Sequence, residues 1–549
     1  MARALRHATA HDIVPPAHRC TTLLRPPFMS RTVRAASSIS AITLLSRVLG
    51  LVRDRLMAQT LGAGWVQGTF LIAWTLPNLM RRLLGEGALS ASLVPAYARL
   101  RERDPDAARR LLEEVAGTVA TVLTPICLLV AAFSLVAPAE WLPAPDEGGV
   151  AAMRLLLSLN AILFTYALPI CLCAVASGAL NTLGIFALPA AVPVVLNLIW
   201  IAALLLAGPL GCQVDTEVAT FAAWSLAVGG FVQLLMVALP LVRRGAFARP
   251  RFGLPKRGTA AFAVFVAMAP TVLGMSLNQI SSLIDQLLAY YLIAPGAVFY
   301  VYLANRLLLF PHALTAMSVA VAVFPRLASE AGDGAHDERA RMRRTLDGSA
   351  AATILVTLPA AAGLILLATD VVEVLFVGGR FGADDVPPTV LTASCLLAGL
   401  PFVGLAQLYA RAFYAVGDTG TPARTAAKLV VLNFATSVTL LMATNLGTAA
   451  LTLSSSLSAL GNALWLSRRF RRHAPPAPGL VGAWLRSIVA TGTMCAVVPF
   501  ARITPPNASL LERALGGLLL PIAVGMTVYV GLHLLLGSPE LRAMRRRRH

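Results

Sequence analysis

Charged side chains are scarce in this chain, with Asp, Glu, Lys and Arg together making up only 13% of its 549 residues. Soluble domains carry roughly 25% charged residues. Hydrophobic residues make up 57% of the sequence, and they gather in apolar runs, many of which reach the roughly 20 residues that a helix needs to cross a bilayer. The composition therefore excludes a soluble protein and predicts an all-α polytopic membrane protein.

Cysteine is also used sparingly. The seven cysteines form no CxxC pair and no cluster with histidine, so the sequence indicates neither a disulfide framework nor a zinc site. The Walker A, HExxH and GxSxG motifs of common soluble enzymes are absent as well. One polar, glycine-rich segment, Gly417–Pro422, interrupts the apolar runs, and a tight turn explains it better than a binding loop. We predict a protein without catalytic residues.

Acidic residues are outnumbered by basic ones, 26 against 45, which gives a net charge of +19. In a soluble protein this excess would suggest nucleic acid, but here the arginines fall into alternate breaks between the apolar runs, the positive-inside pattern of a membrane protein. The alternation places both termini in the cytoplasm and requires an even number of spans, in agreement with about 14 apolar runs. Arg502 and Arg513 are exceptions, because they lie in a break assigned to the outer side. We expect no nucleic-acid partner.

The second half of the chain repeats the first. Four short patterns recur in order at an offset of 230 to 236 residues, and they pair Asp54 with Asp285, Pro95 with Pro325, Pro189 with Pro422, and Asn197 with Asn433. Each copy holds six spans, and an even number gives both copies the same orientation in the membrane. The sequence thus predicts two six-helix lobes, a parallel repeat, around a central cavity, with two extra helices at the C-terminus.

These patterns also set the expected domain boundaries. We predict a disordered basic arm over residues 1–30, a first lobe over 31–258, a second lobe over 259–473, and the two extra helices with a basic tail over 474–549. The first residues lack the apolar core of a secretory signal peptide, and Met29 is an alternative start.

The most unusual segment is Ser46–Arg55, which carries three arginines and an aspartate inside the first apolar run. A charge near the bilayer centre costs at least ~2.5–3.5 kcal/mol, so such residues usually face a cavity or a partner. On a helix Arg47 and Asp54 lie on one face, and Arg53 lies roughly a third of a turn away. This segment is the first candidate for a functional site.

Further charges lie in the second and eighth apolar runs. The second carries Asn78, Arg81 and Arg82, followed by Glu86 at the spacing of an ion pair with Arg82, and the eighth carries Arg306. Arginine exceeds acid in these runs. The arginines either reach the interface and close internal ion pairs, or they bind an anion, for which guanidinium favours phosphate. We favour a carrier of a phosphate-bearing, amphiphilic anion.

This interpretation assigns two sets of site residues. The substrate-binding residues are Arg47, Arg53, Arg81, Arg82 and Arg306, and the gate or ion-pair residues are Asp54, Asn78 and Glu86.

A different kind of site is indicated by Asp285, which has no basic neighbour in the sequence. Asn433 and Ser437 lie in the eleventh apolar run and Thr452 in the twelfth. A carboxylate, an amide and hydroxyls could coordinate Na⁺ or handle a proton. They could equally form hydrogen bonds between helices, and both interpretations stay open. We expect no other cofactor.

Motifs of a known family run through the chain. They are Ser46–Asp54, Gly62–Gly64, Leu76–Arg82, Glu86–Ala88 and Val94–Pro95, then Arg306 with Phe310–Pro311, Phe324–Pro325, and Ala412–Tyr414 with Asp418 and Thr421–Pro422. These segments resemble the MurJ (MviN) family of lipid II flippases, and the matches in the first two spans need no gaps.

The resemblance implies a fold of fourteen helices in the multidrug/oligosaccharidyl-lipid/polysaccharide exporter superfamily. It also implies that the protein moves undecaprenyl-pyrophosphate-linked peptidoglycan precursor from the inner to the outer leaflet of the bacterial cytoplasmic membrane by alternating access. Membrane potential, a Na⁺ gradient or both would supply the energy, and we expect a monomer.

The resemblance also assigns roles to residues. Arg47, Arg53, Arg81 and Arg306 match cavity arginines that are proposed to hold the pyrophosphate. Asp285 and Asn433 fall where some members bind Na⁺, and the last two spans match helices proposed to form a groove for the polyprenyl tail.

Three positions depart from the family pattern. The family often has Asp where Gly68 stands and again where Asn305 stands, and an acidic residue in the sodium site of some members is Ser437 here. These departures concern the outward gate and the sodium site.

Three alternatives compete with this function. A flippase for another polyprenyl-pyrophosphate glycan, such as an O-antigen unit, would use the same arginines. A cation-coupled drug exporter would need an acid-rich cavity. A membrane enzyme acting on polyprenyl phosphates would need an Asp-rich metal motif, and we find none in the sequence.

Overall fold

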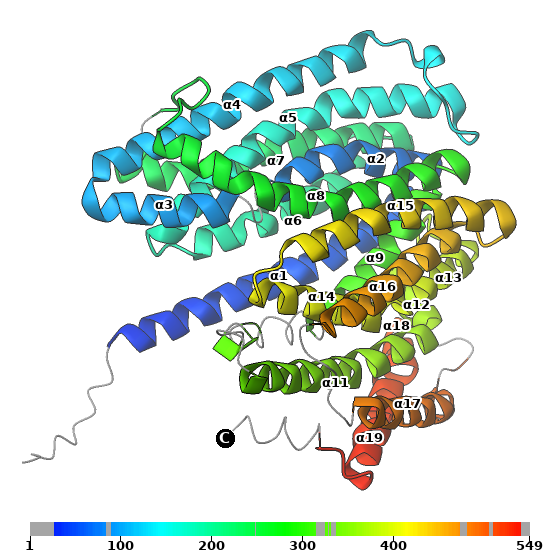
Figure 1. The fold of residues 1–549 in the computed structure, drawn as a ribbon. Helices are drawn as coiled ribbons and strands as arrows, with labels where there is room; N and C mark the ends of the chain where they lie inside the picture. Colours follow the sequence, from blue (N-terminus) through cyan, green and yellow to red (C-terminus); the bar gives the residue numbers. More distant parts are fainter. Residues whose placement is uncertain are drawn as a thin grey trace, which may run out of the picture.

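The computed structural model describes residues 27–83, 89–247, 249–314, 324, 326–327, 329–330, 336–472, 480–503, 505 and 509–539. Most of the expected N-terminal arm, Glu86 and residues 540–549 lie outside this set. Within it the chain forms helices joined by turns, without a β-strand and with one isolated bridge between Gly378 and Phe381. Figure 1 shows this helical architecture, which confirms the predicted all-α fold.

The helices of the first lobe follow the predicted spans. They are α1 (Pro27–Leu61), α2 (Trp65–Met80), α3 (Leu89–Arg103), α4 (Pro105–Val136), α5 (Gly149–Thr182), α6 (Ala187–Ala207) and α7 (Asp215–Arg243). Asp104 caps α4, since its carboxylate accepts a hydrogen bond from the Ala107 N–H at 2.9 Å, and Pro105 takes the first helical position.

The helices of the second lobe and of the C-terminal part also follow the predicted spans. They are α8 (Ala260–Leu292), α9 (Ala297–Leu314), α11 (His336–Leu366), α12 (Ala368–Phe376), α13 (Val386–Leu397), α14 (Leu400–Ala415), α15 (Gly420–Ala443), α16 (Thr448–Phe470), α17 (Leu480–Val497), a π-helical segment (Arg513–Leu519) and α19 (Leu520–Leu535). Here α13 and α14 together form one predicted span.

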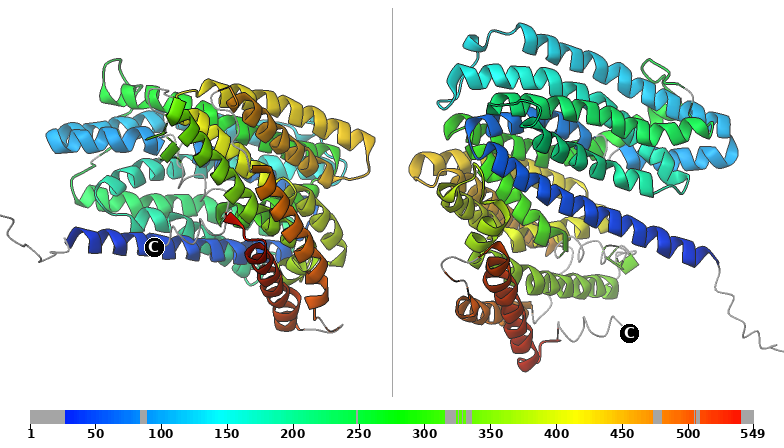
Figure 2. Two further views of the ribbon diagram at one scale, coloured as in Figure 1. Left: turned by 60° about the horizontal axis from the view of Figure 1, so that its bottom comes forward. Right: turned by 180° about the vertical axis from the view of Figure 1, so that it is seen from behind.

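The two lobes use the same helix pairings. In the first lobe α1 packs on α6, α4 on α5, and α7 on α5 and α6; in the second lobe α8 packs on α15, α11 on α14, and α16 on α14 and α15. Helices α17 and α19 pack on each other and on α11. Figures 1 and 2 show α17 and α19 at the opposite edge of the molecule from α4. The same set of helix pairings in both halves is what two six-helix lobes require. The exact domain boundaries stay a prediction.

The predicted spans differ in how long an apolar helix the described residues form. Among the described residues nine helices are long and apolar enough to cross a membrane by length and composition. The predicted spans outside this group are formed by α1, by α2 with α3, and by α8, α9 and α16. Of these spans, α1 carries Arg53, the junction of α2 and α3 carries Arg81, α8 carries Asp285 and α9 carries Arg306.

The glycine-rich segment before α15 is a turn, as predicted. Gly417 has a φ of +81°, a value that favours glycine. The Asp418 carboxylate accepts a hydrogen bond from the Thr421 N–H at 2.8 Å, which satisfies a free donor at the start of α15. The segment therefore serves to start a helix.

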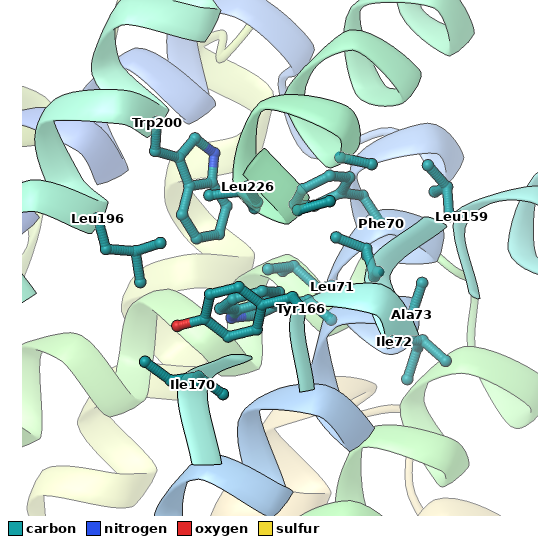
Figure 3. Packing of buried hydrophobic residues seen from close by; sticks show 14 of the residues in the cluster. Phe70, Leu71, Ile72, Ala73, Leu159, Tyr166, Ile170, Leu196, Trp200 and Leu226 are labelled. Atoms are coloured by element: carbon teal, nitrogen blue, oxygen red, sulfur yellow. The ribbon is translucent and has the colours of Figure 1, made fainter. Parts of the chain in front are cut away.

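Aromatic rings fix the first lobe around α2, α5 and α6 (Figure 3). The Trp200 ring on α6 lies 5.6 Å from Phe70 and 5.4 Å from Trp74, both on α2, and Trp74 lies 5.0 Å from Tyr166 on α5. Trp200 is only 2% exposed. Large rings held on several sides have little freedom to move, so this cluster forms a rigid wall behind the charged part of α1.

Candidate functional site

The centre of the site is the pair Arg53–Asp54 on α1. Both side chains are buried, with 6% and 2% of their surface exposed. The Arg53 Nε and Nη2 atoms donate to Asp54 Oδ1 at 3.1 and 2.7 Å. Arg53 also donates through Nη1 to the Asn197 side-chain oxygen at 3.0 Å and through Nη2 to the Tyr302 hydroxyl at 2.8 Å. Because a buried charge is costly without partners, this degree of pairing explains how the lobe tolerates Arg53.

Asp54 is shared with an arginine of the second lobe. Arg306 Nε lies 3.1 Å from Asp54 Oδ2, and Arg306 Nη2 donates to the Tyr302 hydroxyl at 2.8 Å. The Tyr302 hydroxyl in turn donates to Asp54 Oδ1 at 2.7 Å. Two guanidinium groups thus share one carboxylate across the lobes, and the cluster keeps a formal charge of +1.

Tyr302, Asn197 and Trp200 were not predicted as site residues. Tyr302 lies four residues before Arg306 on α9, a spacing that places the two on one helix face and could have indicated it. In the sequence Asn197 stands out only as a marker of the repeat, although an amide in an apolar run is itself unusual. The Arg53 guanidinium carbon lies 4.6 Å from the centre of the Trp200 ring, in cation–π geometry.

Arg47 lies about two turns before Asp54 on α1. It is exposed, and the described residues provide it with no hydrogen bond or ion pair. Leu44 and Val48 beside it are also exposed, at 63% and 52%. The positive charge of Arg47 is therefore available to a ligand.

Arg81 and Arg82 lie where span two is interrupted between α2 and α3, and both are half-buried. Arg81 Nε donates to the Asn78 side-chain oxygen at 3.0 Å, and Arg82 Nη1 donates to the Gln279 side-chain oxygen on α8 at 3.3 Å. Glu86, the predicted partner of Arg82, lies outside the described residues. The structure thus connects Arg81 with Asn78, and it connects Arg82 with the second lobe.

The two lobes also meet at the end of the molecule where α1 turns into α2. Thr75 Oγ1 of α2 donates to Gln286 Oε1 of α8 at 2.7 Å. Thr69 Oγ1, also on α2, lies 3.0 Å from the Tyr290 hydroxyl of α8. The turn Gly62–Gly64 lies against the turn between α8 and α9, where a Cβ on Gly296 would lie 1.9 Å from the Ala63 carbonyl oxygen. No side chain fits between these turns.

The segment between α12 and α13 reinforces this contact. The Arg380 N–H donates to the Gln59 carbonyl at 2.9 Å, and the Arg380 side chain pairs with Asp215 at the start of α7. Asn305 is one of the positions named above as a departure from the family pattern. It is exposed, and its amide donates to the Val301 carbonyl at 2.9 Å.

The predicted cation site is only partly assembled. Asp285 accepts a hydrogen bond from the Ser455 hydroxyl at 3.2 Å, and the Asn433 amide lies 3.3 Å from the same hydroxyl. Turned over, that amide donates to Asp285 Oδ1 at 3.2 Å. The structure therefore brings Asp285 and Asn433 together.

The other two predicted ligands differ in their contacts. The Thr452 hydroxyl donates to the Thr392 carbonyl at 2.9 Å. The buried Ser437 hydroxyl, one turn after Asn433, has no hydrogen-bond partner among the described residues. Carboxylate, amide and hydroxyl oxygens are ligands that suit a hard cation, so the residues fit Na⁺. The described residues hold no group of three or more His, Cys, Asp and Glu side chains that could bind a metal.

The chain is similar in sequence to known proteins. A family model described as lipid II flippase MurJ matches residues 57–508. Lipid II flippase MurJ of Burkholderia cenocepacia is 32% identical over 83% of this chain and 86% of its own length, and a probable lipid II flippase MurJ of Rhizobium tropici is 30% identical over 94% of this chain and 96% of its own length.

Solved structures show the same fold. A lipid II flippase MurJ in an inward closed conformation superposes with a TM-score of 0.73 at 22% identity, covering 91% of this chain and 98% of that one. An inward-facing multidrug resistance transporter of the MATE family gives a TM-score of 0.58 at 14% identity, covering 80% and 98%. At these identities the likeness supports the fold alone.

Proposed function

The chain belongs to the lipid II flippase MurJ family, and on that basis we propose that it moves lipid II from the inner to the outer leaflet of the cytoplasmic membrane by alternating access. It is accordingly a transporter and a multi-pass membrane protein. The observation that carries the proposal is that Arg53 and Arg306, from different lobes, share the single carboxylate of Asp54.

The shared carboxylate suggests how a diphosphate would act. Removing one partner of a buried ion pair costs about 3–5 kcal/mol, because a charge is left uncompensated. A diphosphate can replace Asp54 at Arg306 and so release the lobes without that cost. Arg47, which is exposed, is placed to meet the substrate first, and Arg81 and Arg82 add further positive charge on span two.

The charge pattern supports an assignment of the two ends of the molecule to the two sides of the membrane. With both termini in the cytoplasm, the turns Gly62–Gly64 and Pro295–Gly296 lie on the outer side, and their contact closes the outward gate. Opening this contact while the opposite end closes would expose the headgroup to the outer leaflet. The polyprenyl tail would stay in lipid beside α17 and α19, and a monomer suffices for this cycle.

A Na⁺ gradient is the coupling that the side chains support best. Asp285 and Asn433 converge on Ser455, and Ser437 adds a buried oxygen without a partner. Binding of Na⁺ at the interface of α8, α15 and α16 would stabilise one arrangement of the second lobe. The membrane potential would add to this driving force.

A flippase for another polyprenyl-pyrophosphate glycan is the main alternative, since the arginines would bind its diphosphate equally well. The family model and the curated relatives favour lipid II. A drug exporter is disfavoured, because it would need acids where this chain has Arg47, Arg53 and Arg306.

The test is complementation of bacteria depleted of their own lipid II flippase. We expect the parent chain and Arg257→Ala, which changes an exposed arginine between the lobes, to restore growth, and Arg47→Ala and Arg306→Ala to fail. Failure of the inserted parent chain would contradict the lipid II assignment, and full rescue by both cavity variants would contradict the roles of those arginines.

A further inference from the structure

The guanidinium of Arg53 is held mainly by its own lobe. Asn197 and Trp200 both lie on α6, three residues apart and therefore on one helix face. Asn197 Oδ1 accepts from Arg53 Nη1 at 3.0 Å, and Trp200 lies under the guanidinium at 4.6 Å. We propose that Asn197 and Trp200 are positioning residues that hold Arg53 at the substrate site in every state of the transport cycle.

The Asn197 amide has only one useful orientation. Its Nδ2 donates to the Ser46 carbonyl at 3.0 Å, and a carbonyl oxygen can only accept. The amide oxygen must therefore face Arg53. Asn197 is 6% exposed, so water cannot easily take the place of either partner. The side chain thus joins α6 to α1 at two points, on either side of Gly50.

Trp200 is equally constrained. Its ring is held by Phe70 and Trp74 of α2, so it offers Arg53 a fixed face. Among the described residues, Arg53 contacts Asn197, Trp200 and Asp54 of the first lobe and only Tyr302 of the second lobe. When the lobes separate, Arg53 loses one contact and keeps the other three.

The repeat supports a role beyond packing. Asn197 and Asn433 are equivalent positions, as are Asp54 and Asp285. In the second lobe the amide of Asn433 shares Ser455 with Asp285, so in both lobes an amide lies beside the acidic residue of the first helix. In the first lobe the same arrangement holds an arginine.

The positioning can be measured without a substrate. In protein labelled with 5-fluorotryptophan, Trp200→Phe identifies the ¹⁹F resonance of Trp200. We expect Asn197→Ala to shift this resonance as Arg53→Ala does, and we expect Asn445→Ala, an exposed asparagine in a turn, to leave it in place. In the Arg53→Ala background Asn197→Ala should add no further shift, because Asn197 acts through Arg53.

A shift that persists in the Arg53→Ala background would overturn the proposal, since Asn197 would then act on the ring through packing. No shift in Asn197→Ala would overturn it as well. Both variants are first checked for expression and melting temperature against the parent. Asn197→Asp is a second variant of nearly the same shape, which gives Arg53 another carboxylate.

The consequence for transport rests on the proposed function and is measured separately, as lipid II binding to the purified protein. We expect Asn197→Ala to weaken binding about tenfold, the effect of one hydrogen bond to a charged group, and Asn197→Asp to weaken it more. In the Arg53→Ala background neither change should weaken it further. If the ¹⁹F shift occurs and lipid II affinity is unchanged, the positioning of Arg53 stands and its role in holding the diphosphate is wrong.

Discussion

Gly68 and Pro295 meet backbone to backbone across the two lobes. A Cβ on Gly68 would lie 1.7 Å from the Pro295 carbonyl oxygen, far below any real contact distance. The missing side chain is what allows α2 to approach the turn before α9. If this contact is the outward gate, as proposed above, the gate closes by close packing of main chain.

Gly68→Ala should therefore hold the outward gate open. The turn would have to retreat by about 2 Å to make room for a methyl group, which disrupts the pair Thr75–Gln286 nearby. We expect a short thiol cross-linker to join Thr75→Cys and Gln286→Cys in a protein lacking other cysteines, and to join them much less in Gly68→Ala. Gly348→Ala on α11, where a Cβ meets open space, is the matched control. Equal cross-linking in all three proteins would contradict this account of the gate.

Tyr302→Phe should weaken the closed gate while leaving the packing of α9 almost unchanged. The hydroxyl accepts from Arg53 and Arg306 and donates to Asp54, and hydrogen bonds to charged groups contribute about 1.5–3 kcal/mol. The same cross-linking pair should report a lower closed population. Unaltered cross-linking would mean that the ion pairs alone hold the lobes together.

Arg502 and Arg513, the exceptions to the charge pattern, are neutralised by partners. Arg502 pairs with Asp370 at 3.1 Å and donates to the Leu366 carbonyl, and Arg513 pairs with Glu373 at 3.2 Å. Both contacts fasten α17 and α19 to α12. Arg502→Ala should lower the stability of this attachment by about 1 kcal/mol, since both groups are partly exposed, and proteolysis of the segment between α17 and α19 should become faster. Arg472→Ala, on the exposed end after α16, should have no such effect.

Sodium should stabilise the parent protein if Asp285 and Asn433 bind it. A ligand at ten times its dissociation constant stabilises the folded state by about 1.4 kcal/mol. We expect the melting temperature to rise with NaCl more than with choline chloride at equal ionic strength, and we expect Asp285→Asn to abolish the difference. A sodium effect that survives in Asp285→Asn would place the cation elsewhere.

The sequence alone predicted the membrane class, and it singled out Arg53, Asp54 and Arg306 as charges inside apolar runs. Each of these follows from the cost of placing a given residue in lipid, which depends on composition and position along a span. The internal repeat, and with it the two six-helix lobes, could also be predicted from the sequence, because the equivalent residues keep a nearly constant offset.

Partner choice was decided only by the tertiary structure. Arg53 meets Asn197 and Tyr302, which lie 144 and 249 residues away in sequence, and Gly68 meets Pro295. Such contacts depend on how two helices cross, and a hydrophobic pattern does not specify that angle. For the same reason the sequence did not show that Thr452 donates to the Thr392 carbonyl of α13, and its role as a cation ligand stays a prediction. The sequence shows which polar and charged groups need a partner inside the membrane, and the packing of the helices decides which residues provide that partner.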